Sequence, residues 1–289
     1  MQQGPPTPDW TRTLHHGLRD TLGLPAYWRH SARARRSMPP HRRIPYGPHP
    51  RQYYLLLEPP GSLPTDVLPW ALYLHGGGWT FGTPEAFRPA ARPWLRQGFR
   101  VVLPSYRRPP TVRLPEIVAD CRTAVTHLAN FARTTDRPLS APQIGGISAG
   151  GHLAALLALH PQWWTAAGWP APPTHALLCA APLDFSLLRP RRIFAHRRAQ
   201  DPILQLAHPP QQQLRWLLLH GTRDGLADYR HSLHFHRALE ESGAAAELHT
   251  IPGGGHLASG RWTYDDSDPY AATVADFIRS AAPAPPGPA

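Results

Sequence analysis

Gly146-Ile147-Ser148-Ala149-Gly150-Gly151 lies where a strand-like run, 143–145, meets an Ala/Leu-rich run with the composition of a helix, 152–159. A serine between two glycines at a strand–turn–helix joint is the pattern of a nucleophile elbow. Such a turn strains the serine backbone so that its Oγ stands clear of the sheet, and a Cβ on either flanking glycine would clash. The alternative is a glycine-rich turn in which the serine occurs by chance. The flanking strand and helix favour the elbow.

The size and composition of the chain favour one large domain. Its 289 residues, 42% of them hydrophobic, suit a single α/β domain with a substantial core. No stretch approaches the roughly 20 apolar residues that span a bilayer, and residues 1–6 contain no apolar signal region. A cytoplasmic location without a membrane span is therefore expected. The two cysteines, Cys121 and Cys179, are expected to be buried free thiols.

The charge is strongly positive, and all of it comes from arginine. The formal net charge is +11, and no lysine occurs in the chain. A basic surface can attract nucleic acid, membrane or an anionic substrate, which makes a polyanion-binding protein one hypothesis. No nucleic-acid motif accompanies the arginines, so solvated arginine-rich faces are favoured and no nucleic-acid partner is expected.

Strand-like and helix-like runs alternate through most of the chain. This alternation predicts an α/β fold with a mostly parallel central sheet covered by helices on both faces. Strands are expected at 53–57, 70–74, 100–103, 176–181, 214–219 and 247–251, besides the one before Ser148, and further helices near 86–97 and at 114–132, 229–242 and 268–281.

The two ends differ from this alternating region. Residues 1–45 are interpreted as a helical and basic extension, in which a helix that Asp9 could cap ends at Gly23 and Pro25. Its basic segment, 29–43, is a solvated face, a polyanion contact or part of a lid. Residues 46–281 are the expected catalytic domain. Residues 282–289, rich in Pro and Ala, are expected to be a disordered tail.

A second glycine-rich motif, His-Gly-Gly-Gly-Trp at 75–79, directly follows the expected strand 70–74. Glycines let backbone N–H groups approach a substrate closely, and preorganised N–H groups stabilise the oxyanion of acyl transfer. Gly77, Gly78 and Ala149 are therefore the candidate oxyanion-hole donors. The alternative is a turn that binds phosphate or nothing. Both motifs occurring together, each after a strand, weakens that alternative.

A serine nucleophile needs a histidine base, and the chain offers 18 histidines. His256 is the candidate because it follows the last strand on the glycine-rich loop 252–255. His152 belongs to the first turn of the expected helix after the elbow, and His220 is expected to pack at a turn.

An acid must then hold the tautomer of the histidine. Asp224 lies on the loop after the strand 214–219, which puts the three residues in the order Ser148, Asp224, His256. This is the chain order of the α/β-hydrolases. Asp228 and Asp184 remain rival acids.

With these parts placed, the chain resembles the α/β-hydrolase superfamily, and within it the esterases with an HGGG motif. These include hormone-sensitive-lipase-like carboxylesterases, kynurenine formamidase-like enzymes and feruloyl or acetyl-xylan esterase-like enzymes. The resemblance covers 46–281 and implies an acyl-enzyme mechanism without a cofactor, a small lid, and Trp79 in the acyl pocket. It is carried by HGGGW at 75–79, SYR at 105–107, GISAGGHLAALLAL at 146–159, HGTRD at 220–224 and PGGGH at 252–256.

The sequence departs from these families in places. Residues 225–228, Gly-Leu-Ala-Asp, replace a Pro-Leu-Val-Pro-like run, which keeps Asp228 open as the acid. Residues 108–111, Arg-Pro-Pro-Thr, replace a Leu-Ala-Pro-Glu run. The expected lid segment, 185–210, is rich in arginine and has no family-specific match.

The leading hypothesis is a serine carboxylesterase for small, short-acyl esters. An arylformamidase acting on N-formylkynurenine is the alternative, because arginines in a lid could bind a substrate carboxylate. A non-catalytic α/β-hydrolase-like binding protein is disfavoured by the intact triad. A metal site is not expected, since no zinc-ligand spacing occurs. The arginines of the expected lid are Arg189, Arg191, Arg192, Arg197 and Arg198.

Overall fold

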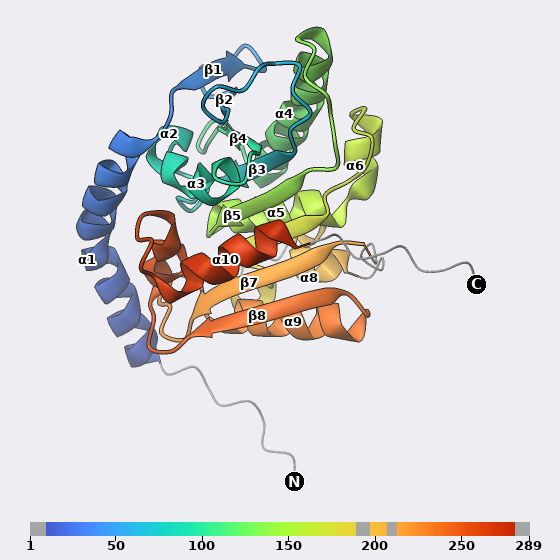
Figure 1. Cartoon of the computed structure of the whole chain (residues 1–289). Helices are drawn as coiled ribbons and strands as arrows, with labels where there is room; N and C mark the ends of the chain where they lie inside the picture. The colour runs from blue at the N-terminus through green and yellow to red at the C-terminus, as the bar shows by residue number, and fades with distance from the viewer. Residues whose placement is uncertain (1–9, 189–196, 207–212, 281–289) are drawn as a thin grey trace.

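A single sheet organises the computed structural model of the chain, which describes residues 10–188, 197–206 and 213–280 (Figure 1). Within these residues eight strands lie in the order β1-β2-β4-β3-β5-β6-β7-β8. The strands are β1 His41–Pro45, β2 Tyr53–Leu57, β3 Trp70–Leu74, β4 Arg100–Pro104, β5 Gln143–Ile147, β6 His175–Cys179, β7 Arg215–Gly221 and β8 Ala245–Ile251.

The sheet is mostly parallel, as the alternation of elements predicts. Neighbouring strands from β4 through β3, β5, β6 and β7 to β8 run parallel. Strand β2 is antiparallel to both β1 and β4. Strands β2 to β6 are buried along their whole length, so their continuous apolar runs fit a sheet that is covered on both faces.

The two faces of the sheet carry separate hydrophobic cores. Successive residues of β3 alternate between them: Leu72 and Leu74 pack on one side, Ala71 and Tyr73 on the other. The first face is covered by α4 Leu114–Thr134, α5 Ala149–Leu159, α6 Pro161–Ala166, α8 Pro202–Gln205 and α9 Arg230–Glu241. The second is covered by α1 Trp10–Ala34, α2 Pro84–Phe87, α3 Arg92–Leu95, α10 Pro269–Arg279 and the 3-10 helices η2 Arg88–Ala91 and η5 His256–Thr263.

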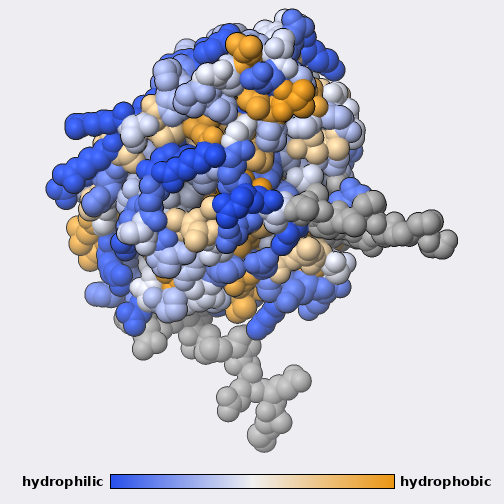
Figure 2. Space-filling view, in the orientation of Figure 1, coloured by the Kyte–Doolittle hydropathy of each residue, from blue (hydrophilic) through white to orange (hydrophobic). Residues whose placement is uncertain are grey.

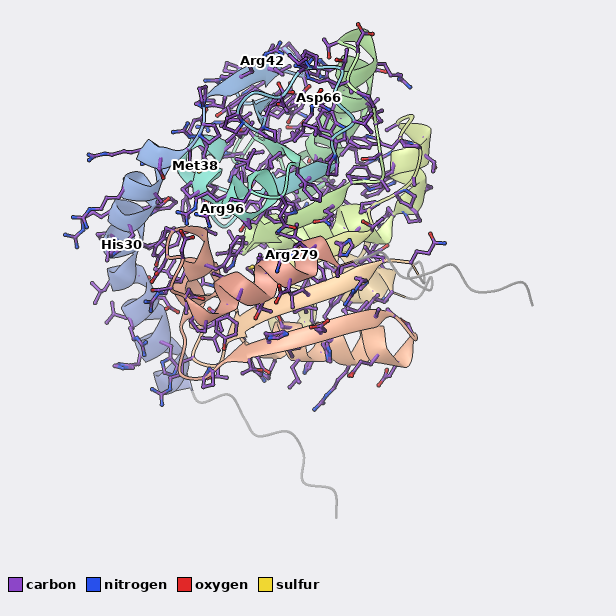
Figure 3. The ribbon with its side chains drawn as sticks, in the orientation of Figure 1. His30, Met38, Arg42, Asp66, Arg96 and Arg279 are labelled. Carbon is purple, nitrogen blue, oxygen red and sulfur yellow. The ribbon has the colours of Figure 1, made fainter. Side chains whose placement is uncertain are left out.

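Helix α1 is longer than predicted, because it continues through Gly23 and Pro25 to Ala34. Pro25 is exposed, so its ring points away from the protein body. Tertiary contacts offset the cost of about 3 kcal/mol that a proline imposes within a helix. Ser31 Oγ donates to Ala86 O (2.8 Å), and His30, labelled in Figure 3, stacks on Tyr264. Asp9, the expected cap, lies outside the described residues.

Two other expectations are corrected. Residues 41–45, placed in the extension, form edge strand β1, so the sheet begins before residue 46. Only Ile44 of strand β1 is buried, so the strand lacks the alternation of apolar and polar residues by which a strand is usually predicted. The helix expected near 86–97 is instead α2, η2 and α3 in succession, since Pro89 and Pro93 cannot donate helical hydrogen bonds.

Several arginines belong to internal ion pairs instead of solvated faces. The buried Arg100 donates to Glu58 Oε1 (3.0 Å), and Arg137 donates to the second oxygen of the same carboxylate (3.1 Å). Arg107 pairs with the buried Asp120 (2.7 Å). Figure 2 shows hydrophilic residues over most of the visible face, with apolar residues in smaller patches. Both Cys121 and Cys179 are buried and free, as predicted.

Parts of the expected lid and the tail fall outside the described residues. Arg189, Arg191 and Arg192 lie there, as does the segment 282–289. The described part of the lid segment contains the 3-10 helices η3 Phe185–Leu187 and η4 Arg198–Gln200, followed by α8. In the part of the chain that the structure covers, no helix has the length and apolarity required to cross a bilayer.

Candidate active site

Ser148 stands at the sharp turn between β5 and α5. Its backbone has φ 55° and ψ −125°, a conformation that non-glycine residues rarely adopt. Its N–H donates to Cys179 O on β6 (2.8 Å), which holds the turn against the sheet. A Cβ on Gly150 would lie 2.1 Å from Leu74 O, so only glycine permits this close crossing. The serine is therefore held by the turn at the carboxyl end of the central strands.

The glycine motif after β3 forms a second tight loop beside Ser148. Gly77, Gly78 and Trp79 have φ values of 122°, 53° and 61°. The N–H groups of Thr80 and Phe81 both donate to Gly77 O (2.9 Å each), which closes the loop on itself. Its backbone conformation is therefore fixed before any ligand arrives.

His75, the first residue of the motif, anchors this loop to the protein core. Its ring stacks on Tyr106, with centroids 4.6 Å apart, and Tyr106 OH donates to His75 O (3.2 Å). Burial lowers the pKa of His75 to about 4, so the ring is neutral at physiological pH. His75 is thus a packing residue of the loop.

Asp224 and His256 form a hydrogen-bonded pair on adjacent loops. His256 Nδ1 donates to Asp224 Oδ2 (2.7 Å), although the residues are 32 positions apart. The other carboxylate oxygen, Oδ1, accepts from the N–H groups of Leu226 and Ala227 (2.8 Å each). The carboxylate therefore has one oxygen facing the backbone and one facing the imidazole.

The charges of this pair stabilise each other. Burial alone would raise the pKa of Asp224, but the charge of His256 and the hydrogen bonds from His256 and His220 lower it below its usual range. Burial lowers the pKa of His256, yet the charge and hydrogen bond of Asp224, with a further contribution from Asp20, raise it overall. The pair is suited to holding a proton on the imidazole.

His220 is a second histidine on the same carboxylate, and the sequence predicted only that it packs at a turn. Its Nε2 faces two acceptors, Asp224 Oδ2 (3.0 Å) and Ala227 O (2.8 Å), so we assign the proton to Nε2. Its Nδ1 then accepts from Ser232 Oγ (2.7 Å). The four-residue spacing of His and Asp within HGTRD, 220–224, is a signal in the sequence that could have indicated this contact.

The rival acids have other partners. Asp228 forms an ion pair with Arg230 (2.7 Å). Asp184 accepts from His234 Nδ1 (2.8 Å) and from Ser186 N (2.9 Å). Of the three candidate carboxylates, the structure brings Asp224 to His256.

Trp79 and His152 pack together at one wall of the site. Trp79 Nε1 donates to His152 Nδ1 (3.3 Å), and His152 Nε2 donates to Gln200 O (2.7 Å). His152 stacks on Phe185, with centroids 5.1 Å apart, and burial lowers its pKa to about 4. His152 is therefore a neutral residue that orients Trp79 and links it to the segment containing Gln200.

A cavity of about 260 Å³ brings these parts together. Ser148 and His256 both line it, as do the expected oxyanion residues Gly77, Gly78 and Ala149. Asp224 is not part of this lining and reaches the cavity only through its bond to His256. The rest of the described lining is almost entirely apolar: Leu24, Tyr27, Trp28, Gly76, Trp79, Phe81, Phe87, Ile147, Pro182, Leu188, Leu226, Ala227 and Leu257.

Comparison with known proteins agrees with this geometry. A family model described as the alpha/beta hydrolase fold matches residues 71–218, which is half of the chain. The chain belongs to this family. The matched region of this α/β-hydrolase includes the HGGGW loop and the elbow.

Within the described residues, no group of three or more His, Cys, Asp or Glu side chains is arranged to hold a metal ion.

The relatives of this α/β-hydrolase include proteins named as esterases. Esterase LipQ of Mycobacterium tuberculosis is 28% identical over 269 residues, covering 83% of this chain but only 63% of LipQ. The propionate-bound esterase Est2 of Thermogutta terrifontis superposes with a TM-score of 0.66 at 22% identity, covering 83% and 92% of the two chains. A truncated carbohydrate esterase from gut microbiota superposes at 0.69 with 17% identity, covering 84% and 96%. At these identities the two structural likenesses concern the fold.

Proposed function

We propose that the chain is a serine carboxylesterase that cleaves small, short-acyl esters. The observation that carries the proposal is the single cavity lined by Ser148 at its strained turn, by His256 paired with Asp224, and by the Gly77–Gly78 loop. The relationship to LipQ, which is named an esterase, supports the same reaction class.

The residues are assigned roles that follow from their positions. His256 Nε2 takes the proton of Ser148 Oγ as that oxygen attacks the ester carbonyl carbon. The carbonyl oxygen becomes an oxyanion, stabilised by the N–H groups of Gly77, Gly78 and Ala149. The C–O bond to the alcohol breaks, and the imidazolium returns its proton to the leaving alkoxide. Water, activated by the same histidine, then hydrolyses the acyl-serine ester and restores Ser148.

Asp224 supports the base in both steps. Its carboxylate holds the proton on His256 Nδ1, which leaves Nε2 free to accept the proton of the serine. It also stabilises the imidazolium that forms during each step. His220 and two backbone N–H groups hold Asp224 in place without exposing it to solvent.

The cavity favours a small and uncharged substrate. Its volume of about 260 Å³ is below the roughly 300–1,000 Å³ of sites for drug-sized ligands. The described walls contain no arginine, and the described Arg197 and Arg198 of the lid segment do not line it. The carboxylate-bearing N-formylkynurenine therefore has no described cationic partner here, so no observation favours the arylformamidase alternative.

Acyl-chain length tests the substrate proposal. We expect kcat/KM for p-nitrophenyl esters to be highest between acetyl and butyryl and to fall steeply beyond about eight carbons, because longer chains outgrow the cavity. N-formylkynurenine is assayed alongside. A maximum at long chains would contradict the compact site, and formamide cleavage faster than the best ester would favour the arylformamidase.

Gly77→Ala tests the oxyanion loop. An added Cβ would lie 2.2 Å from Phe81 O, so the loop must shift and its N–H donors move. We expect kcat to fall by about 10²-fold, the scale of losing one oxyanion donor. Gly98→Ala is the matched control, since Gly98 also has a positive φ (81°) but its Cβ would meet open space. An unchanged kcat in a folded Gly77→Ala variant would place the oxyanion hole elsewhere.

A further inference from the structure

Helix α1 presents a buried carboxylate to the loops of the proposed triad. Asp20 is only 5% exposed, although it lies on a helix outside the sheet. Its Oδ2 accepts from Gly225 N (2.9 Å), the backbone N–H directly after Asp224. The two residues are separated by 205 positions in the sequence. A buried carboxylate with a partner so distant in the chain requires a close and specific fit.

The same carboxylate also touches the loop that carries His256. A Cβ on Gly255 would lie 2.0 Å from Asp20 Oδ1, so Asp20 packs directly against the backbone before His256. One side chain thus contacts the residue after the proposed acid and the residue before the proposed base. Asp20 therefore bridges two loops whose spacing determines how Asp224 meets His256.

The helix approaches these loops closely because glycine faces glycine. A Cβ on Gly225 would lie 2.0 Å from Gly17 N. Leu24, one turn after Asp20, lines the cavity, as do Tyr27 and Trp28 in the next turn of α1. The position of α1 therefore fixes both the carboxylate and part of the cavity wall.

Two carboxylates act on the charge of His256 from two different elements. Asp224 reaches it from the loop after β7, and Asp20 from α1. Burial lowers the pKa of His256, while Asp224 and then Asp20 raise it. His220 Nε2 bonds to Asp224 Oδ2, the same oxygen that accepts from His256. Between α1 and the segment 255–265, a hollow is lined by Arg19, Asp20, His30, Arg261 and Asp265, among others.

We propose that Asp20 is a positioning residue that joins the acid and base loops and supplies a second negative charge to His256. The assignment rests on the esterase function proposed above. Asp20 touches neither substrate nor the reacting atoms, and acts through Gly225, Gly255 and His256.

Asp20→Asn tests this role because it keeps an oxygen that can accept from Gly225 N–H but removes the charge. Losing a nearby negative charge lowers the pKa of the imidazole, so the acid limb of the kcat/KM profile should move to lower pH by roughly 0.5 to 1 unit. On the plateau, kcat should fall about three- to tenfold with KM nearly unchanged, because the imidazolium is less stabilised. The measurement is kcat and KM for p-nitrophenyl acetate from pH 4 to pH 9.

Asp66→Asn is the matched control. Asp66 also accepts a backbone N–H, from Leu63 (2.8 Å), but it lies before β3, away from α1 (Figure 3). The acid limb of the kcat/KM profile of Asp66→Asn should coincide with that of the parent. Asp20→Glu, which retains the charge, should also keep the limb of the parent. If Asp20→Asn does not fold, Asp20→Ser takes its place, since it removes the charge and keeps a hydroxyl acceptor.

The outcomes separate this proposal from the proposed function. An unmoved acid limb in a folded charge-removing variant overturns the role of Asp20, whether or not the rate falls. A fall in rate alone would reveal a structural contact only. The His256 ring is also titrated by NMR, with its signal assigned from His256→Asn. A parent that neither hydrolyses esters nor reacts with a fluorophosphonate at Ser148 refutes the function, while the titration still decides whether Asp20 acts on His256.

Discussion

Ser148→Ala is expected to lower kcat by about 10⁴-fold or more while the fold survives, as loss of a triad nucleophile does. In the proposed mechanism the Ser148 hydroxyl oxygen forms the acyl-enzyme, and neither His256 nor the Gly77–Gly78 loop can replace it. Alanine at this position retains the N–H that donates to Cys179 O, so the turn keeps its anchor. The strained φ of 55° remains, which means that the thermal stability should change little.

A fluorophosphonate probe supplies the direct measurement. The parent should be labelled at Ser148, as identified by peptide mass spectrometry, and Ser148→Ala should not be labelled. Ser37→Ala is the control, since Ser37 is exposed on the 3-10 helix η1 Arg35–Ser37 and its Oγ donates only to Ala34 O (2.9 Å). Labelling that persists in Ser148→Ala would remove this residue from the mechanism.

Asp224→Asn is expected to reduce kcat by a factor approaching 10⁴, because the amide has a donor where the carboxylate has an acceptor. The N–H groups of Leu226 and Ala227 both donate to the Oδ1 position, so the amide oxygen of the asparagine must occupy that position. The amide NH₂ then faces His256 Nδ1 and His220 Nε2, both of which are donors. His256 must change tautomer to accept from this NH₂, and its Nε2 then carries a proton and cannot act as the base.

Asp228→Asn and Asp184→Asn provide the comparison. The carboxylate of Asp228 pairs with Arg230, and that of Asp184 bonds to His234, so neither change alters the tautomer of His256. Both variants should keep kcat within about tenfold of the parent, the scale of losing one surface or peripheral contact. A deeper loss in Asp228→Asn than in Asp224→Asn would transfer the role of the acid to Asp228.

The strands could be predicted from the sequence because burial on both faces leaves continuous apolar runs. Trp70–Leu74 and Arg100–Pro104 are examples, and each is buried throughout. Strand β1 was missed because an edge strand needs few apolar residues, and His41–Pro45 buries only one side chain. The full length of α1 was also missed. Its passage through Pro25 depends on contacts with distant segments, which no local pattern reveals.

The proposed site also contains parts that local sequence predicts and parts that only the fold brings together. Ser148 and the Gly77–Gly78 loop were predictable because each depends on a tight turn whose glycines are adjacent in sequence. The sequence favoured Asp224 as the acid but kept Asp228 open, because local sequence does not show which of two carboxylates on one loop contacts His256. Asp20 gave no sequence signal at all. An isolated aspartate in a helix is ordinarily a solvated residue, and only the fold brings it to Gly225.

The docking of α1 has a consequence for the order in which the molecule is completed. The helix is synthesised before every strand, yet its partners Gly225 and Gly255 are among the later residues to leave the ribosome. Contacts that close so long a stretch of chain form slowly, because the entropy of closure must be lost before they are gained. The sheet can therefore assemble while the first helix remains undocked. The cavity has its wall of Leu24, Tyr27 and Trp28 only when that helix is docked, so the site is complete only after the first helix and the last loops of the chain have met.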